Sequence, residues 1–167
     1  MLFSIRSFLS VSLLALALFL GIARAEMEDQ RKYLIDPATT AINGITITTT
    51  EREIIRRLGK PKSVEKGYSE VENKPSKNLN YDGMKIYVID GAIYNFSCTS
   101  KRCRTDRGVQ VSDSKAKVIE IYGPGNPPYE GSENDTLSYP LKGIDSYLIF
   151  LFRDGKVAEI EFFVDFV

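Results

Sequence analysis

An internal repeat is the sequence feature that most constrains how this chain can fold. Residues 44–59, GITITTTEREIIRRLG, align without a gap on residues 108–123, GVQVSDSKAKVIEIYG. Glycine matches glycine at both ends, and the β-branched, hydroxyl and apolar positions between the glycines also match. Such self-similarity indicates that the chain builds the same structural unit twice.

The repeated segment predicts one short amphipathic helix in each half, over residues 49–58 and 113–122. Thr48 and Ser112 stand where an N-cap is expected, because a hydroxyl oxygen there accepts a bond from a free N–H group of the first turn. Each segment ends in a glycine that a proline follows closely, which is typical of a helix that stops in the left-handed conformation. These glycines are Gly59 and Gly123.

A β-hairpin is expected after each helix. The runs MKIYVI and AIYNFS flank one Asp-Gly pair, and the runs LIFLFR and KVAEIEFF flank another. Asp-Gly between two such runs is the strongest short hairpin signal, since both residues tolerate positive φ. The turn residues are Asp90, Gly91, Asp154 and Gly155. The polar segments PKSVEKGYSEVENKPSKN and PGNPPYEGSEND are interpreted as loops.

The fold class that follows is a two-layer α+β protein with a tandem repeat. Each repeat is expected to contribute a short helix and an antiparallel meander of about three strands, so that one sheet carries the helices on one face. Residues 44–107 form repeat 1, which includes the cysteine loop, and residues 108–167 form repeat 2. Residues 26–43 are expected to add an N-terminal arm or strand.

Residues 1–25 have the pattern of a secretory signal peptide. Arg6 precedes an apolar run, and Ala23-Arg24-Ala25 has the form that signal peptidase accepts. The run is shorter than the ~20 residues of a spanning helix, so no integral membrane segment is expected in the mature chain. No cysteine lies near the cleavage site, so no lipid anchor is evident. We therefore expect a periplasmic or secreted protein.

The two cysteines, Cys98 and Cys103, are expected to form an intramolecular disulfide, because exported cysteine pairs are usually oxidised. The bridge would close a short loop that holds the densest basic cluster of the chain. Its members are Lys101, Arg102, Arg104 and Arg107. The cluster is interpreted either as a solvated loop or as a binding patch.

Composition argues against several classes of function. The chain contains no histidine and only two cysteines, which excludes His-based acid–base catalysis and His- or Cys-rich zinc sites. Removing residues 1–25 leaves 20 basic and 22 acidic side chains, so the mature chain is near neutral and no nucleic-acid partner is expected. No catalytic residue, metal ligand or cofactor is predicted.

The pattern of a capped helix, a polar loop and a strand-turn-strand unit resembles the SmpA/BamE and β-lactamase-inhibitor-protein (BLIP) group of exported domains. The residues that carry the resemblance are Leu58-Gly59-Lys60-Pro61, Tyr122-Gly123-Pro124 and Asp154-Gly155-Lys156-Val157. It extends over residues 44 to about 164. The resemblance implies non-catalytic protein recognition, and the inhibitor proteins bind enzymes across a concave, aromatic-bearing sheet.

We therefore expect a non-enzymatic protein-interaction module, either an envelope scaffold or a protein inhibitor, whose partner is another exported or envelope protein. Residues 44–107 carry 13 Lys/Arg and 8 Asp/Glu, whereas residues 108–167 carry 5 and 10. Halves of opposite sign suit head-to-tail association or a bipolar partner, although two diverging repeats would also produce them. The alternatives are a small secreted enzyme that uses carboxylates, and a toxin- or secretion-system accessory protein.

The partner is expected to dock on the sheet face opposite the helices. With a two-residue turn, Ile149 pairs with Ile160 and Tyr147 with Phe162, and this apolar face is expected to cover the helices. The candidate partner-binding residues on the other face are Leu148, Phe150, Phe152, Phe163, Tyr87 and Tyr94. The alternative is that the N-terminal arm or the long loops cover these aromatic side chains.

Overall fold

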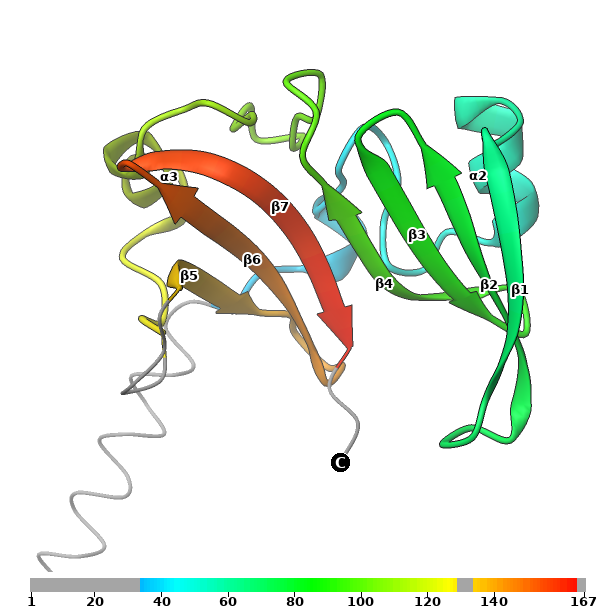
Figure 1. Cartoon of the computed structure of the whole chain (residues 1–167). Coiled ribbons are helices and arrows are strands. Elements are labelled where there is room, and N and C mark those ends of the chain that lie inside the picture. The colour runs from blue at the N-terminus through cyan, green and yellow to red at the C-terminus, as the bar shows by residue number, and fades with distance from the viewer. Residues whose placement is uncertain (1–33, 129–133, 165–167) are drawn as a thin grey trace, which may run out of the picture. The chain divides into compact units, whose positions relative to one another are not determined.

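A seven-stranded antiparallel sheet organises this protein in its computed structural model (Figure 1). The structure describes residues 34–128 and 134–164, so the expected signal peptide, residues 1–25, lies outside the described residues. Two α-helices accompany the sheet in the described part of the chain, which confirms the α+β class. In chain order the elements are η1 (Pro37–Thr39), α2 (Glu51–Leu58), β1 (Ser63–Ser69), β2 (Lys74–Tyr81), β3 (Met84–Ile89), β4 (Ala92–Cys98), α3 (Lys115–Tyr122), β5 (Asp135–Pro140), β6 (Ser146–Arg153) and β7 (Lys156–Val164).

The strands follow the order β1-β2-β3-β4-β7-β6-β5 across the sheet. β2, β3 and β4 form one meander, β5, β6 and β7 form a second, and antiparallel pairing of β4 with β7 joins them. A register row of fully buried side chains crosses six of the strands. Its members are Leu79, Ile86, Phe96, Phe162, Leu148 and Tyr139. The core therefore lies against the sheet face that these side chains share.

Both helices contact this buried face. In α3, the ring centroid of Tyr122 lies 5.4 Å from that of Tyr139 and 5.2 Å from that of Phe150. In α2, the Glu51 carboxylate lies 2.8 Å from the ammonium of Lys77, which shares its face of β2 with the buried row. In Figure 1, β1 crosses in front of α2, and β7 in front of α3. One sheet face thus carries both helices.

Each helix begins two residues later than the sequence predicts, so Thr48 and Ser112 are not the N-caps. Thr50 caps α2, because its hydroxyl accepts from the Glu53 N–H while the Glu53 carboxylate accepts from the Thr50 N–H. Ser114 caps α3. Ser112 instead adopts a φ of 81° and donates its N–H to a carbonyl of β7. Pairing with β7 therefore holds the residues before Ser114 outside α3.

A glycine and a tyrosine hydroxyl close the C-terminus of each helix. Gly59 and Gly123 have φ values of 81° and 89°, and each donates its N–H to the carbonyl four residues earlier. The Tyr81 hydroxyl donates to the Gly59 carbonyl at 3.1 Å, and the Tyr139 hydroxyl donates to the Gly123 carbonyl at 2.8 Å. These bonds satisfy carbonyl groups that a helix end leaves without a partner.

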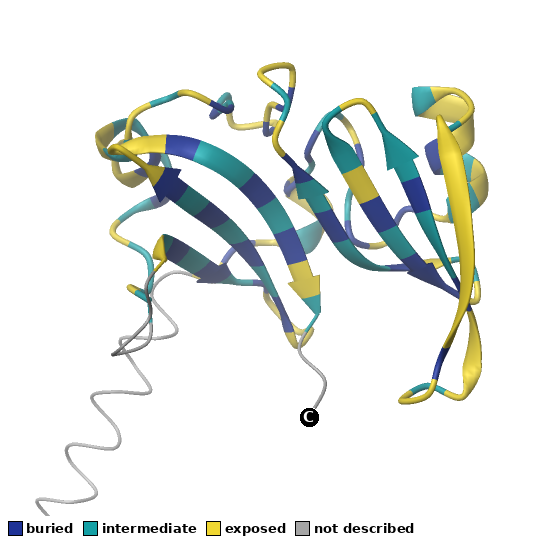
Figure 2. Cartoon of the chain, in the orientation of Figure 1, coloured by how far each residue is buried: buried dark blue, intermediate teal, exposed yellow. Residues whose placement is uncertain are grey.

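The segment after α2 forms a long hairpin rather than the expected loop. β1 pairs with β2 from Ser63 opposite Asn80 to Ser69 opposite Lys74. Asn73, with a φ of 52°, supplies a left-handed residue at the turn. Most of β1 is exposed, as its yellow colour in Figure 2 shows. An edge strand that solvent reaches on both faces needs no apolar alternation, so its sequence is polar and resembles that of a loop.

Both Asp-Gly pairs lie in two-residue hairpin turns. The φ values are 51° and 81° at Asp90 and Gly91, and 53° and 69° at Asp154 and Gly155. Positive φ at both central residues matches the right-handed twist of the flanking strands. These turns set the antiparallel course of β3–β4 and of β6–β7.

The N-terminal segment connects the two meanders. Ile35 bridges Leu141 just after β5, and Ile42 bridges Thr105 in the loop that leads to the second half. Ile35 and Ile42 are both buried. Residues 34–43 therefore contact both halves of the chain. Among the described residues, no helix is both long and apolar enough to span a membrane.

Candidate protein-binding face

The sheet face opposite the helices, called the open face below, carries a second register row across six strands. Its members are Asn78, Tyr87, Asn95, Phe163, Tyr147 and Pro140. Neighbouring strands lie about 4.8 Å apart, so the row is about 24 Å long. Phe163 is 37% exposed, while Tyr87 and Tyr147 are half-buried. In Figure 2 the strands alternate between buried and partly exposed residues, as a sheet with one covered face does.

Three candidate residues of β6 lie on the buried face and not on the open face. They are Leu148, Phe150 and Phe152, each 5% exposed or less. The expected pairing of Ile149 with Ile160 is wrong, because the register shifts next to the turn and leaves Ala158 as an extra residue on β7. Ile160 therefore pairs with Phe150, and Ile149 pairs with Glu161. A one-residue slip exchanges the two faces of a strand, so Phe150 and Phe152 belong to the core, whereas Tyr147 faces the other way.

Two other candidates from the first half are partly exposed. Tyr87 lies in the open-face row, as hydropathy alone would place it, since its neighbours Ile86 and Val88 are buried. Tyr94 is the extra residue of a second β-bulge, in β4. Burial and a hydrogen bond to Glu72 raise the pKa of Tyr94 above its ordinary value. Tyr94 therefore contacts the turn of the β1–β2 hairpin.

The open face also holds two carboxylates of β7, Glu159 and Glu161. The amide nitrogen of Asn95 donates to Glu161 Oε1 at 2.7 Å across the β4–β7 junction. Burial raises the pKa of Glu161; the Asn95 bond opposes this rise, and the charge of Glu159 adds to it. The residues paired with Glu161, Ser97 on β4 and Ile149 on β6, carry no charge. Glu161 is thus a partly desolvated carboxylate on a mostly uncharged surface.

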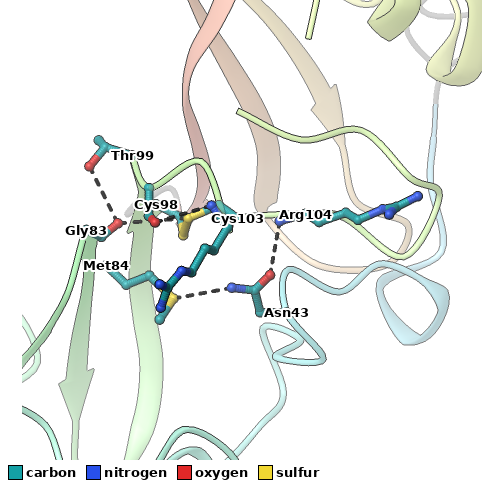
Figure 3. Close-up of a disulfide and its surroundings, with 9 residues drawn as sticks. Asn43, Gly83, Met84, Cys98, Thr99, Cys103 and Arg104 are labelled. Carbon is teal, nitrogen blue, oxygen red and sulfur yellow. Dashed lines mark hydrogen bonds between the residues drawn. A yellow bond between two sulfur atoms is a disulfide. The ribbon is translucent and has the colours of Figure 1, made fainter. Parts of the chain in front are cut away.

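The disulfide loop lies against the β2–β3 turn (Figure 3). Cys98 and Cys103 are bonded, with their Cα atoms 6.0 Å apart, and both are fully buried. The Gly83 carbonyl accepts from the N–H groups of Thr99 and Ser100 at 2.8 and 3.2 Å. A Cβ added to Gly83 would lie 2.6 Å from the Ser100 side chain, so only glycine fits this contact. The bridge therefore fixes the connection between the two meanders.

The four basic residues of this loop differ in their contacts. The Arg107 guanidinium stacks over the Tyr122 ring at 4.9 Å from its centroid. The backbone of Arg104 is bound to the backbone and side chain of Asn43, as Figure 3 shows for the side-chain bond. Lys101 and Arg102 are exposed at the tip of the loop. All four residues are exposed, so the solvated loop and the binding patch both stay predictions.

Comparison with known proteins shows a shared fold without a family. No protein-family model and no curated protein matches this chain. An extracellular SCP-domain protein from Bacillus anthracis is similar in structure, with a TM-score of 0.50 and 8% identity. The match covers 71% of this chain and 44% of that protein, so this chain spans less than half of it.

Two further solved structures are similar at lower scores. The uncharacterized protein yfeY from Escherichia coli has a TM-score of 0.45 and 14% identity, over 74% of this chain and 95% of that one. A DUF4309 family protein, YjgB, from Bacillus subtilis has a TM-score of 0.40 and 13% identity, over 73% and 83%.

The sequence reasoning missed Asn95, which the structure joins to Glu161. They are 66 positions apart in the chain, and neither belongs to a motif. The charge of Glu161 at an alternating strand position was a usable signal, because a carboxylate marks the face that solvent reaches. Tyr147 was missed for another reason, since the unshifted register placed it on the buried face.

Proposed function

We propose that this protein is an exported, non-enzymatic protein-interaction module that binds a partner protein across its open face. The observation that carries the proposal is the row of Tyr87, Phe163 and Tyr147 on the sheet face that carries no helix. Tyrosine and other aromatic side chains dominate the binding energy of protein interfaces, because they bury a large area at low entropic cost.

Two observations support the exported character. The Cys98–Cys103 disulfide agrees with an oxidising compartment. Residues 1–25 have the pattern of a signal peptide. A sheet with helices on one face and aromatic side chains on the other is also what the SmpA/BamE- and BLIP-like resemblance implies.

We also infer that the two halves are a tandem repeat. Equivalent contacts recur at a spacing of 64 residues, as the alignment requires. The Glu51 N–H donates to the Gly91 carbonyl at 3.0 Å, and the Lys115 N–H donates to the Gly155 carbonyl at 2.9 Å. The hydroxyl caps and glycine stops recur at the same spacing. The repeat supports the proposal because it aligns two meanders into one continuous open face.

Capture from the envelope fraction with the exported protein as bait tests the proposed function. We expect the double variant Tyr87→Ser, Phe163→Ser to lose a captured partner about tenfold or more, because both rings lie in the row. Ile144→Ser is the matched control, since Ile144 is 41% exposed outside the open face. Circular dichroism confirms that each variant is folded. Equal capture by the double variant and the unchanged protein would overturn the proposal.

A further inference from the structure

Two neighbouring carboxylates of β7 on the open face, Glu159 and Glu161, form no ion pair within the described part of the chain. The ion pairs there join Lys62 to Asp82, Lys74 to Asp90, Lys77 to Glu51, Lys115 to Asp135 and Lys117 to Asp113. Neither Glu159 nor Glu161 takes part. Lys85 lies in the same register row as Glu161, but two strands away, so that roughly 10 Å separates the backbones of the two residues.

The folded chain therefore holds a carboxylate where its charge is unfavourable. Glu161 lies between uncharged neighbours on β4 and β6, and its hydrogen bond comes from a neutral amide. A neutral donor compensates less than a cation would, because an amide has no net charge to attract the carboxylate. A cation that arrives with a partner would supply the missing half of the interaction.

The aromatic row beside Glu161 suits the rest of a basic side chain. Phe163 follows Glu161 by two residues on the same face of β7, and Tyr147 pairs with Phe163. Lysine and arginine carry an apolar stem that packs on such rings, and their charged ends are attracted to ring faces. The carboxylates and the rings together form a complementary surface for one basic residue.

We propose that the open face binds a lysine or arginine side chain of the partner protein, held between Glu159, Glu161 and the aromatic row; this rests on the function proposed above. A metal ion fits the site less well, because no three His, Cys, Asp or Glu side chains cluster for coordination among the described residues. A row about 24 Å long also matches an extended polypeptide segment better than a small ion.

Random peptides displayed on phage and selected on the exported protein test this inference. We expect the enriched peptides to share a lysine or arginine next to an apolar residue. Binding of a synthetic copy should fall about tenfold or more with Glu161→Gln, and by a similar factor when its basic residue is replaced by glutamine. Peptides without a basic residue, or with equal affinity for Glu161→Gln, would overturn the inference.

The matched control is Glu120→Gln. Glu120 is an exposed glutamate of α3, on the side of the sheet that carries the helices and away from the open face. Its replacement should leave peptide binding unchanged; an equal loss would indicate unspecific attraction and overturn the inference.

The Tyr87→Ser, Phe163→Ser variant separates this inference from the function on which it rests. Peptides that need these rings but not Glu161 would leave the proposed function standing and overturn only the basic-residue site. Peptides that need neither would overturn both. Displacement of the peptides by the protein itself would identify a second copy as the occupant and overturn the assignment to a separate partner.

Discussion

Phe150→Ala is the change that tests most directly which sheet face is the core. The Phe150 ring is fully buried, and its centroid lies 5.2 Å from that of Tyr122 and 5.9 Å from that of Tyr139. Truncation removes roughly 150 Å² of buried apolar surface, which at about 25 cal/mol per Å² corresponds to about 4 kcal/mol. We therefore expect the free energy of unfolding to fall by about 4 kcal/mol, in the range of about 3–5 kcal/mol for buried phenylalanines.

Phe163→Ala is the matched variant on the open face. Phe163 is already 37% exposed in the folded protein, so its truncation should cost about 2 kcal/mol or less. Urea titration followed by circular dichroism, with linear extrapolation to water, measures both changes. An equal or larger loss with Phe163→Ala would show that the two faces are assigned the wrong way round, and the proposed binding face would fall with that assignment.

Three other changes test separate features. Alkylation without reductant should leave Cys98 and Cys103 unlabelled in the purified protein, and two labelled thiols would contradict the bridge. Replacing both cysteines with serine should lower the free energy of unfolding by about 2 kcal/mol, as the loop-entropy relation gives for so short a loop. Glu161→Gln should raise the melting temperature at about pH 7, and this gain should disappear near pH 3.5. Because the pKa of Glu161 is raised in the folded state, the protonated carboxyl group adds to stability at low pH, and this contribution is lost as the pH rises through the folded-state pKa. An advantage that persists at low pH would contradict this cause. Gly83→Ala should lower the free energy of unfolding by about 1–3 kcal/mol more than Gly143→Ala does. Both glycines have positive φ, but only Gly83 lies against the disulfide loop. Equal decreases in melting temperature for the two variants would contradict the close contact.

Local chemistry determined the C-terminal ends of the two helices and the two Asp-Gly turns of this protein. A glycine needs no long-range contact to favour positive φ, so Gly59, Gly123 and the Asp-Gly pairs could be placed from their neighbours in the sequence. The cysteine pairing was equally local, since the chain has only two cysteines and five positions separate them. The α+β class followed from the alternation of one capped helix with one hairpin in each half.

Secondary structure that depends on pairing with another strand could not be predicted from the neighbouring residues in the sequence. The strand β1 exists because β2 offers it a pairing edge, although its own residues are as polar as those of a loop. The N-caps at Thr50 and Ser114 lie two residues past the predicted positions, and before α3 the bonds of Ser112 and Asp113 with β7 hold the preceding residues in place. In both β1 and the segment before α3, the stabilising backbone hydrogen bonds come from a strand that the local sequence does not reveal.

The sequence by itself determined that successive side chains of β6 point to opposite faces of the sheet. Only the tertiary structure decided which of the two sets lies in the core. Both sets of side chains are apolar: Tyr147, Ile149 and Leu151 on one face, and Leu148, Phe150 and Phe152 on the other. A single extra residue, Ala158, shifts the register and turns the second set toward the helices, where Tyr122 contacts Phe150. Glu161 came to face Asn95 in the same way, because the β4–β7 junction joins strands that are distant in the chain.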